Sequence, residues 1–294
     1  MESLRRSEIE EVAAGLEFTE GPAWHPDGYL VFSDIPASTI YRLGRHGLEV
    51  FRRPSGNSNG LAFDPQGRLV ACEHGNRRVS ITREDGTVAP LATHYQGKRL
   101  NSPNDVVVRS DGAVYFTDPP YGVEADKREL DFQGVFRVTP DGALTVVAGD
   151  FVKPNGLCFS PDESLLYIAD TELHQVRVFD VAGDGTLAGG RVFFQVSAPA
   201  QLRPDGMKVD AEGNLYVAGF DGVWVIAPDG RHVETWPLPI RLSNLAFGDD
   251  GLSLYITARP VVYRVRVRHP GATATATATD ERRATDLTDL HRSG

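Results

Sequence analysis

Short apolar segments alternate with turn sequences along most of this chain, and the alternation repeats at a regular interval. In each repeat an acidic or amide residue precedes an apolar strand, a turn with Gly or Asp, and a second strand rich in Val, Leu, Tyr and Ile. Spacings of 39, 45, 51, 50 and 39 residues separate the opening residues, which are Glu20, Asn59, Asn104, Asn155, Asp205 and Asn244. Periods of about 40 to 50 residues with four strand-sized pieces are typical of propeller blades.

The second repeat shows the four strands of one period most clearly. Two-residue links such as Asp85-Gly86 favour tight antiparallel hairpins. Apolar alternation places its strands at 61–64, 68–73, 78–83 and 88–92.

The sixth repeat contains only three strands, at 245–247, 253–257 and 261–267. We expect the N-terminal segment 9–14 to pair with the last of them, because this pairing would close the ring and remove both sheet edges. The sequence therefore predicts an all-β fold, a six-bladed β-propeller of four-stranded antiparallel blades closed by an N-terminal strand.

The repeat runs through nearly all 294 residues, so we expect one propeller domain over 1–270. Residues 271–294 contain no bulky apolar side chain before Leu287 and are expected to form a flexible tail. The formal charge of −10 argues against a nucleic-acid partner. The chain contains neither an apolar stretch of about 18 residues nor an apolar signal-peptide core, so we expect no membrane association and a cytoplasmic protein, as a monomer or weak dimer.

The residues that open the repeats are the strongest functional signal. In a propeller they enter the innermost strands and meet at one mouth of the central channel. Oxygen donors without His or Cys select hard divalent cations, Ca²⁺ first and Mg²⁺ or Mn²⁺ next. Glu20 and Asp205 would neutralise one dication, and Asn155 with Asn104 would add amide oxygens. Asn59 and Asn244 also suit a purely structural role, because Asn often makes turns by hydrogen-bonding to its own backbone.

The loops between the second and third strands of the blades should open at the same mouth. They contain His74 and Tyr121 among polar residues. Such a mixture around a polar centre suits a small polyhydroxylated ligand.

At these residues the sequence resembles the SMP-30/gluconolactonase/LRE family, and in particular its bacterial gluconolactonase branch. The likeness covers roughly residues 8–268. It depends on an ordered set of motifs: EGPAW at 20–24, CEHGNRRV at 72–79, GKRLNSPNDVVV at 97–108, YFTDPPYG at 115–122, KPNGLCFSPD at 153–162 and RPDGMKVD at 203–210.

The resemblance implies a six-bladed propeller with a divalent metal, Ca²⁺ first and Zn²⁺ also among those expected, in its central tunnel. It implies that Glu20, Asn155 and Asp205 bind the metal, that Asp205 also acts as acid and base, and that Asn104 contacts the substrate. Animal members carry an Arg two residues before this Asn, where the present chain has Ser102. That contact would pass to Arg99 or Asn101.

The expected activity is metal-dependent hydrolysis of a sugar lactone, of the gluconolactone type, to the open-chain aldonic acid. Two alternatives remain open at this point. One is another hydrolase on the same scaffold, such as a phosphotriesterase. The other is a non-enzymatic binding propeller whose axial metal only holds the blades together.

Overall fold

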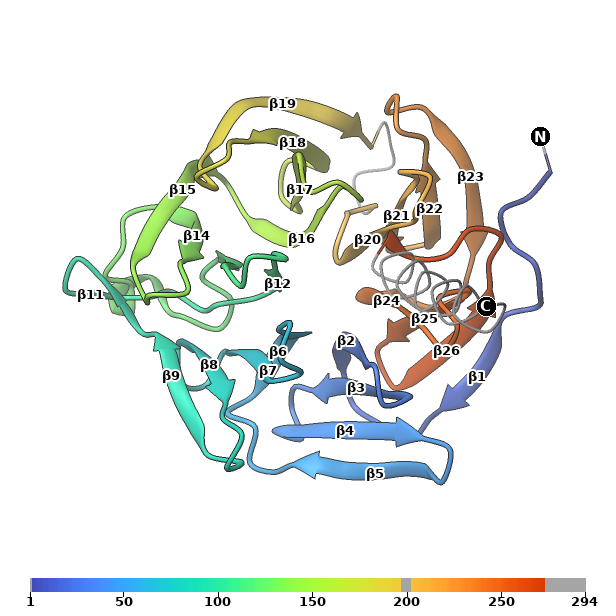
Figure 1. The fold of residues 1–294 in the computed structure, drawn as a ribbon, viewed down its shortest axis with the longest axis horizontal. Coiled ribbons are helices and arrows are strands. Elements are labelled where there is room, and N and C mark those ends of the chain that lie inside the picture. Colours follow the sequence, from blue (N-terminus) through green and yellow to red (C-terminus); the bar gives the residue numbers. More distant parts are fainter. Residues whose placement is uncertain (1, 197–201, 273–294) are drawn as a thin grey trace, which may run out of the picture.

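The computed structural model describes residues 2–196 and 202–272. Over these residues the chain forms six four-stranded antiparallel sheets arranged around a common axis (Figure 1). The predicted six-bladed propeller is confirmed.

Each blade runs outward from an inner strand that faces the axis. Blade 1 contains β2 (Thr19–His25), β3 (Tyr29–Asp34), β4 (Thr39–Gly44) and β5 (Gly47–Arg52), and blade 2 contains β6 (Ser58–Phe63), β7 (Leu69–Glu73), β8 (Arg78–Thr82) and β9 (Val88–Ala92). Blade 3 contains β12 (Val106–Val108), β13 (Val114–Asp118), β14 (Gln133–Val138) and β15 (Leu144–Phe151), and blade 4 contains β16 (Pro154–Phe159), β17 (Leu165–Asp170), β18 (Gln175–Val181) and β19 (Leu187–Gln195). Blade 5 contains β20 (Met207–Val209), β21 (Leu215–Gly219), β22 (Gly222–Ile226) and β23 (His232–Pro237), and blade 6 contains β24 (Asn244–Gly248), β25 (Ser253–Ala258), β26 (Val261–Arg266) and β1 (Glu10–Ala13).

The N-terminal strand closes the ring, as the sequence predicts. β1 pairs antiparallel with β26, with Glu10 opposite Arg264. The first strand of the chain therefore becomes the outer strand of the last blade, which ties the two ends of the propeller together and leaves no missing strand at the seam.

Two features interrupt the regular pattern, and both lie near blade 3. A small hairpin of β10 (His94–Tyr95) and β11 (Lys98–Arg99) precedes the blade. The connection from β13 to β14 is long and contains the short 3-10 helix η1 (Ala125–Lys127). Such insertions leave the apolar alternation unchanged, so the periodic pattern does not predict them.

The apolar core lies between blades. Strand residues alternate between the two faces of each sheet, and each face packs against the neighbouring blade. One buried cluster, for example, joins Val70 and Cys72 of blade 2 to Phe116 and Phe136 of blade 3. A similar cluster joins Phe32 of blade 1 to residues of blade 6, so apolar packing also extends across the seam.

Glycines allow the inner strands to approach one another closely at the axis. A Cβ on Gly156 would lie 2.3 Å from the backbone oxygen of Asp205, and one on Gly60 would lie 2.6 Å from the Cα of Asp105. Any larger residue would force these strands apart.

At the C-terminal end of the described chain, the N–H of Gly271 donates to the backbone oxygen of Gly251. The remainder of the tail predicted from the sequence, residues 273–294, lies outside the described residues. No helix in 2–196 or 202–272 is long and apolar enough to cross a membrane.

Candidate active site at the propeller axis

The residues that open the repeats all lie buried on the inner strands or at most two positions before them. Each of these residues is at most 4% exposed, and the set is Glu20, Asn59, Asn104, Asn155, Asp205 and Asn244. Residues spread over more than two hundred positions are thus gathered around one axis.

Three carboxylates interact at this axis. Burial, together with the negative charges of Asp205 and Asp105, raises the pKa of Glu20 well above its usual range. Burial raises the pKa of Asp205 to about 7, and burial also raises that of Asp105. The common cause is burial, which removes water from each carboxylate and disfavours its charged form.

Two cations oppose the effect of burial on these pKa values. Lys208 acts on Asp105, and Arg241 acts on Asp205. An Nη atom of Arg241 lies 3.4 Å from Oδ2 of Asp205. The guanidinium carbon of Arg241 also lies 3.7 Å from the centre of the Phe220 ring, in a cation–π contact. Arg241 therefore holds the Asp205 carboxylate from the loop before β24 and opposes the effect of burial on its pKa.

The amide of Asn155 lies beside these carboxylates and is held by two hydroxyls. Its Nδ2 is 3.0 Å from Oγ1 of Thr171 and 3.4 Å from the hydroxyl of Tyr121. Because both N–H groups face hydroxyls, the Oδ1 atom of Asn155 is left as an oxygen donor for a ligand. The nearby Asn155 side chain also lowers the pKa of Asp205.

His74 and Tyr121 lie above the same mouth. Their rings are 6.4 Å apart and nearly parallel, and Nε2 of His74 is 3.0 Å from Nδ2 of Asn59. Burial lowers the pKa of His74 to about 4. The imidazole is therefore neutral at pH 7 and accepts the Asn59 N–H.

A recurring carboxylate positions three of the axial residues. In blades 1, 3 and 4 the last residue of the second strand is Asp, and it accepts two backbone N–H groups from the segment just before the inner strand. In each blade the two donors are the residues three and two positions before the axial residue, which is Glu20, Asn104 or Asn155. They are Glu17 and Phe18 for Asp34, Asn101 and Ser102 for Asp118, and Val152 and Lys153 for Asp170.

Two other predicted substrate residues make contacts on the outer side of the site. Nδ2 of Asn101 donates to the backbone oxygens of Asp118 and Phe132, each at 3.1 Å. Arg99 donates to the backbone oxygen of Asn76 at 3.0 Å. Neither bond joins these residues to the axial carboxylates, whereas Asn104 is buried at the axis itself.

The donor set can be compared with the requirements of a cation. No three His, Cys, Asp or Glu side chains in the described part of the chain gather as a metal-binding group. A cation at the axis would therefore need amide oxygen as well as carboxylate, and Glu20, Asp205 and Asn155 supply this combination. Two buried carboxylates faced by a single guanidinium also favour a divalent cation, because buried charge is costly unless it is paired. The residues present fit a hard divalent ion such as Ca²⁺.

Sequence reasoning missed two residues of this site. Asp105 follows Asn104, whereas Gly follows Glu20, Asn59, Asn155 and Asp205. That substitution within an otherwise regular pattern is a signal that could have identified Asp105. Nothing in the sequence singles out Arg241, whose contact with Asp205 depends on the packing of Phe220.

The comparisons with known proteins agree with this architecture. The profile of the SMP-30/Gluconolactonase/LRE-like region matches residues 18–259. A gluconolactonase from Zymomonas mobilis is 35% identical over 293 residues, covering 88% of this chain and 81% of its own length. The pentonolactonase XacC of Haloferax volcanii is 27% identical over 257 residues, covering 81% of this chain and 80% of its own length. The solved structure of a gluconolactonase from Xanthomonas campestris superimposes with a TM-score of 0.83 at 35% identity, covering 90% of this chain and 91% of that one. The chain belongs to the SMP-30/gluconolactonase/LRE-like family.

Proposed function

We propose that this protein hydrolyses a sugar lactone of the gluconolactone type to the open-chain aldonic acid, with the help of a divalent cation. The observation that carries the proposal is the pair of buried carboxylates, Glu20 and Asp205, with the Asn155 amide beside them. The similarity to a gluconolactonase and a pentonolactonase supports aldonolactones as the substrate class.

Glu20, Asn155 and Asp205 would hold the cation, with Ca²⁺ the first choice and Mg²⁺, Mn²⁺ or Zn²⁺ as alternatives. Such an ion supplies positive charge that stabilises the oxygen on which negative charge develops when an ester carbonyl is attacked.

Asp205 is the proposed acid and base. Its carboxylate takes a proton from the water whose oxygen attacks the lactone carbonyl carbon, and returns that proton to the ring oxygen as the ring C–O bond breaks. The products are a carboxylic acid and a free hydroxyl on one open chain. Arg241 keeps the carboxylate oriented through the 3.4 Å contact.

The remaining predicted residues would bind the sugar. Asn104 and Tyr121 lie nearest the axial group and would contact hydroxyls close to the ester. His74, neutral at pH 7, can exchange hydrogen bonds without adding charge. Asn101 and Arg99 would act further out, on the blade 3 side.

The test is a panel of gluconolactone, xylonolactone and a phosphotriester, assayed with metal-stripped protein and with Ca²⁺, Mg²⁺, Mn²⁺ or Zn²⁺ restored in turn. We expect lactone hydrolysis that disappears on stripping and returns with a cation. Faster turnover of the phosphotriester would refute the substrate class, and activity indifferent to stripping would refute the role of the cation.

A further inference from the structure

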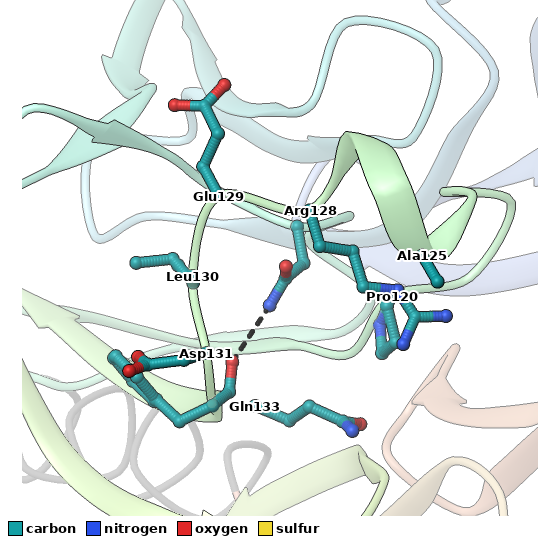
Figure 2. Close-up of a pocket in the computed structure, with 9 residues that line it drawn as sticks. Pro120, Ala125, Arg128, Glu129, Leu130, Asp131 and Gln133 are labelled. Carbon is teal, nitrogen blue, oxygen red and sulfur yellow. Dashed lines mark hydrogen bonds between the residues drawn. The ribbon is translucent and has the colours of Figure 1, made fainter.

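A cavity of about 360 Å³ is lined mainly by the long connection between β13 and β14 (Figure 2). This connection spans residues 119–132, whereas the corresponding one in blade 4 spans only 171–174. Pro120 lines the cavity, and the next residue, Tyr121, contacts Asn155 at the axis. The segment that lines the cavity therefore continues into a residue that contacts the proposed site. The cavity volume falls within the range of small-molecule pockets, about 300–1,000 Å³.

Hydrogen bonds from blade 2 and from the β10–β11 hairpin hold the wall of the cavity in place. Nη1 of Arg77 donates to the backbone oxygen of Lys127 at 3.2 Å, and Nε of the same residue donates to that of Asn101 at 2.8 Å. The carboxylate of Glu129 accepts the backbone N–H of Arg99 at 2.7 Å. These bonds tie the inserted segment to blade 2 and to the β10–β11 hairpin, so the cavity belongs to an ordered part of the fold.

Two residues that line the cavity carry buried oxygen acceptors without a donor. They are Oδ1 of Asn101 and Oε1 of Gln133. The orientation of the Asn101 amide is fixed, because its Nδ2 donates to two backbone carbonyls that can only accept. Buried acceptors in native proteins are normally satisfied, so these two atoms indicate a ligand that brings hydrogen-bond donors.

The charges around the cavity narrow the class of ligand. Glu129 and Asp131 disfavour an anion, whereas Arg128 adds a cationic donor. Figure 2 shows the Arg128 side chain extending toward Pro120 and the Glu129 carboxylate extending away from Gln133. A neutral group that both donates and accepts hydrogen bonds fits this lining, and sugar hydroxyls are such groups.

We propose that the cavity is a second subsite, which binds a hydroxyl-bearing part of the lactone remote from the ester. The occupant is either the exocyclic chain of the lactone or a sugar unit attached to it. Gln133 and Arg128 would then determine substrate length. This inference rests on the proposed lactonase function, and the experiment below separates the two.

The experiment compares xylonolactone, gluconolactone and cellobionolactone, which carry successively more hydroxylated structure beyond the ring. We expect Gln133→Leu to lower the ratio of kcat/KM for cellobionolactone to that for xylonolactone roughly threefold to tenfold, because one acceptor is lost. Arg128→Gln, on an exposed residue, should lower it in the same direction. The matched control is Gln175→Leu, since Gln175 begins β18 of blade 4 as Gln133 begins β14 of blade 3, and both are half-buried.

A binding measurement on the full chain, by calorimetry with cellobiitol, gives an answer independent of hydrolysis. The sugar alcohol should bind the wild-type protein and the Gln175→Leu control alike, and bind Gln133→Leu roughly threefold to tenfold more weakly. Equal affinity in all three, or no binding to the wild-type protein, overturns the subsite. If no lactone is hydrolysed and cellobiitol binding still depends on Gln133, the hydroxyl subsite stands and the proposed function fails.

Discussion

Asn244 donates a side-chain N–H to Oδ2 of Asp105 at 3.2 Å, although 139 positions separate the two residues. Asn244 begins the inner strand of blade 6, and Asp105 directly precedes that of blade 3. These blades lie on opposite sides of the ring (Figure 1). The bond therefore links opposite blades across the axis and gives Asn244 a structural role beside the proposed catalytic group.

Replacing Asn244 with Leu should lower the free energy of unfolding by about 1–3 kcal/mol, because buried Asp105 loses a donor. Urea unfolding of metal-free protein measures the change. In the double variant with Asp105→Leu the two losses should be less than additive, since neither polar partner is then left alone. Strict additivity would show that the bond across the axis contributes nothing.

Replacing Asp205 with Asn should keep the fold and reduce lactone turnover by about 10² to 10⁴, the usual contribution of a general acid or base. The free energy of unfolding should stay the same or increase, because the substitution removes one of several buried carboxylates that raise one another's pKa. Steady-state kinetics and thermal unfolding measure the two effects. Undiminished kcat in a folded variant would remove Asp205 from the mechanism.

Much of the fold was predictable because the same pattern recurs in every period. The positions of Glu20, Asn155 and Asp205 relative to their strands indicate an axial group before any contact is known, and segment 9–14 does supply the closing strand. A periodic pattern predicts the structural features that successive blades have in common.

Features that occur in only one blade cannot be predicted from such a pattern. The insertion at 119–132 forms a cavity with Gln133, and the contact of Arg241 with Asp205 depends on where the Phe220 ring packs. Similarly, the hairpin that contains Arg99 directs this residue to Asn76 rather than to the axis. Each of these contacts is set by tertiary packing between segments whose sequences carry no common signal.

Adding Ca²⁺ to metal-free protein should raise the melting temperature, because a ligand that binds only the folded state stabilises that state. At a ligand concentration one hundred times the dissociation constant, the stabilisation is about 2.7 kcal/mol. Glu20→Gln should abolish most of this shift by removing one of the two proposed carboxylate ligands. Glu17→Gln is the control, since Glu17 is exposed three residues earlier. A Ca²⁺-dependent shift that survives in Glu20→Gln would place the ion elsewhere.

Asp118 should make the stability of the protein depend on pH. Burial raises the pKa of Asp118 to about 7, against the two backbone N–H groups of Asn101 and Ser102 that favour its charged form. Between the unfolded value of about 4 and the folded value, the folded protein holds a proton that the unfolded chain has released. Stability therefore falls as the pH rises through this window, by at most about 1.4 kcal/mol per pH unit from this group.

The variant Asp118→Asn tests this dependence. Its absolute stability also changes, because one of the two N–H groups loses its acceptor, so the informative quantity is the slope of stability against pH. Urea unfolding at intervals from pH 4.5 to pH 7.5 should give a shallower fall for Asp118→Asn than for the wild-type protein. Parallel curves would mean that Asp118 is ionised in the folded protein throughout this range, and that the hydrogen bonds from Asn101 and Ser102 outweigh its burial.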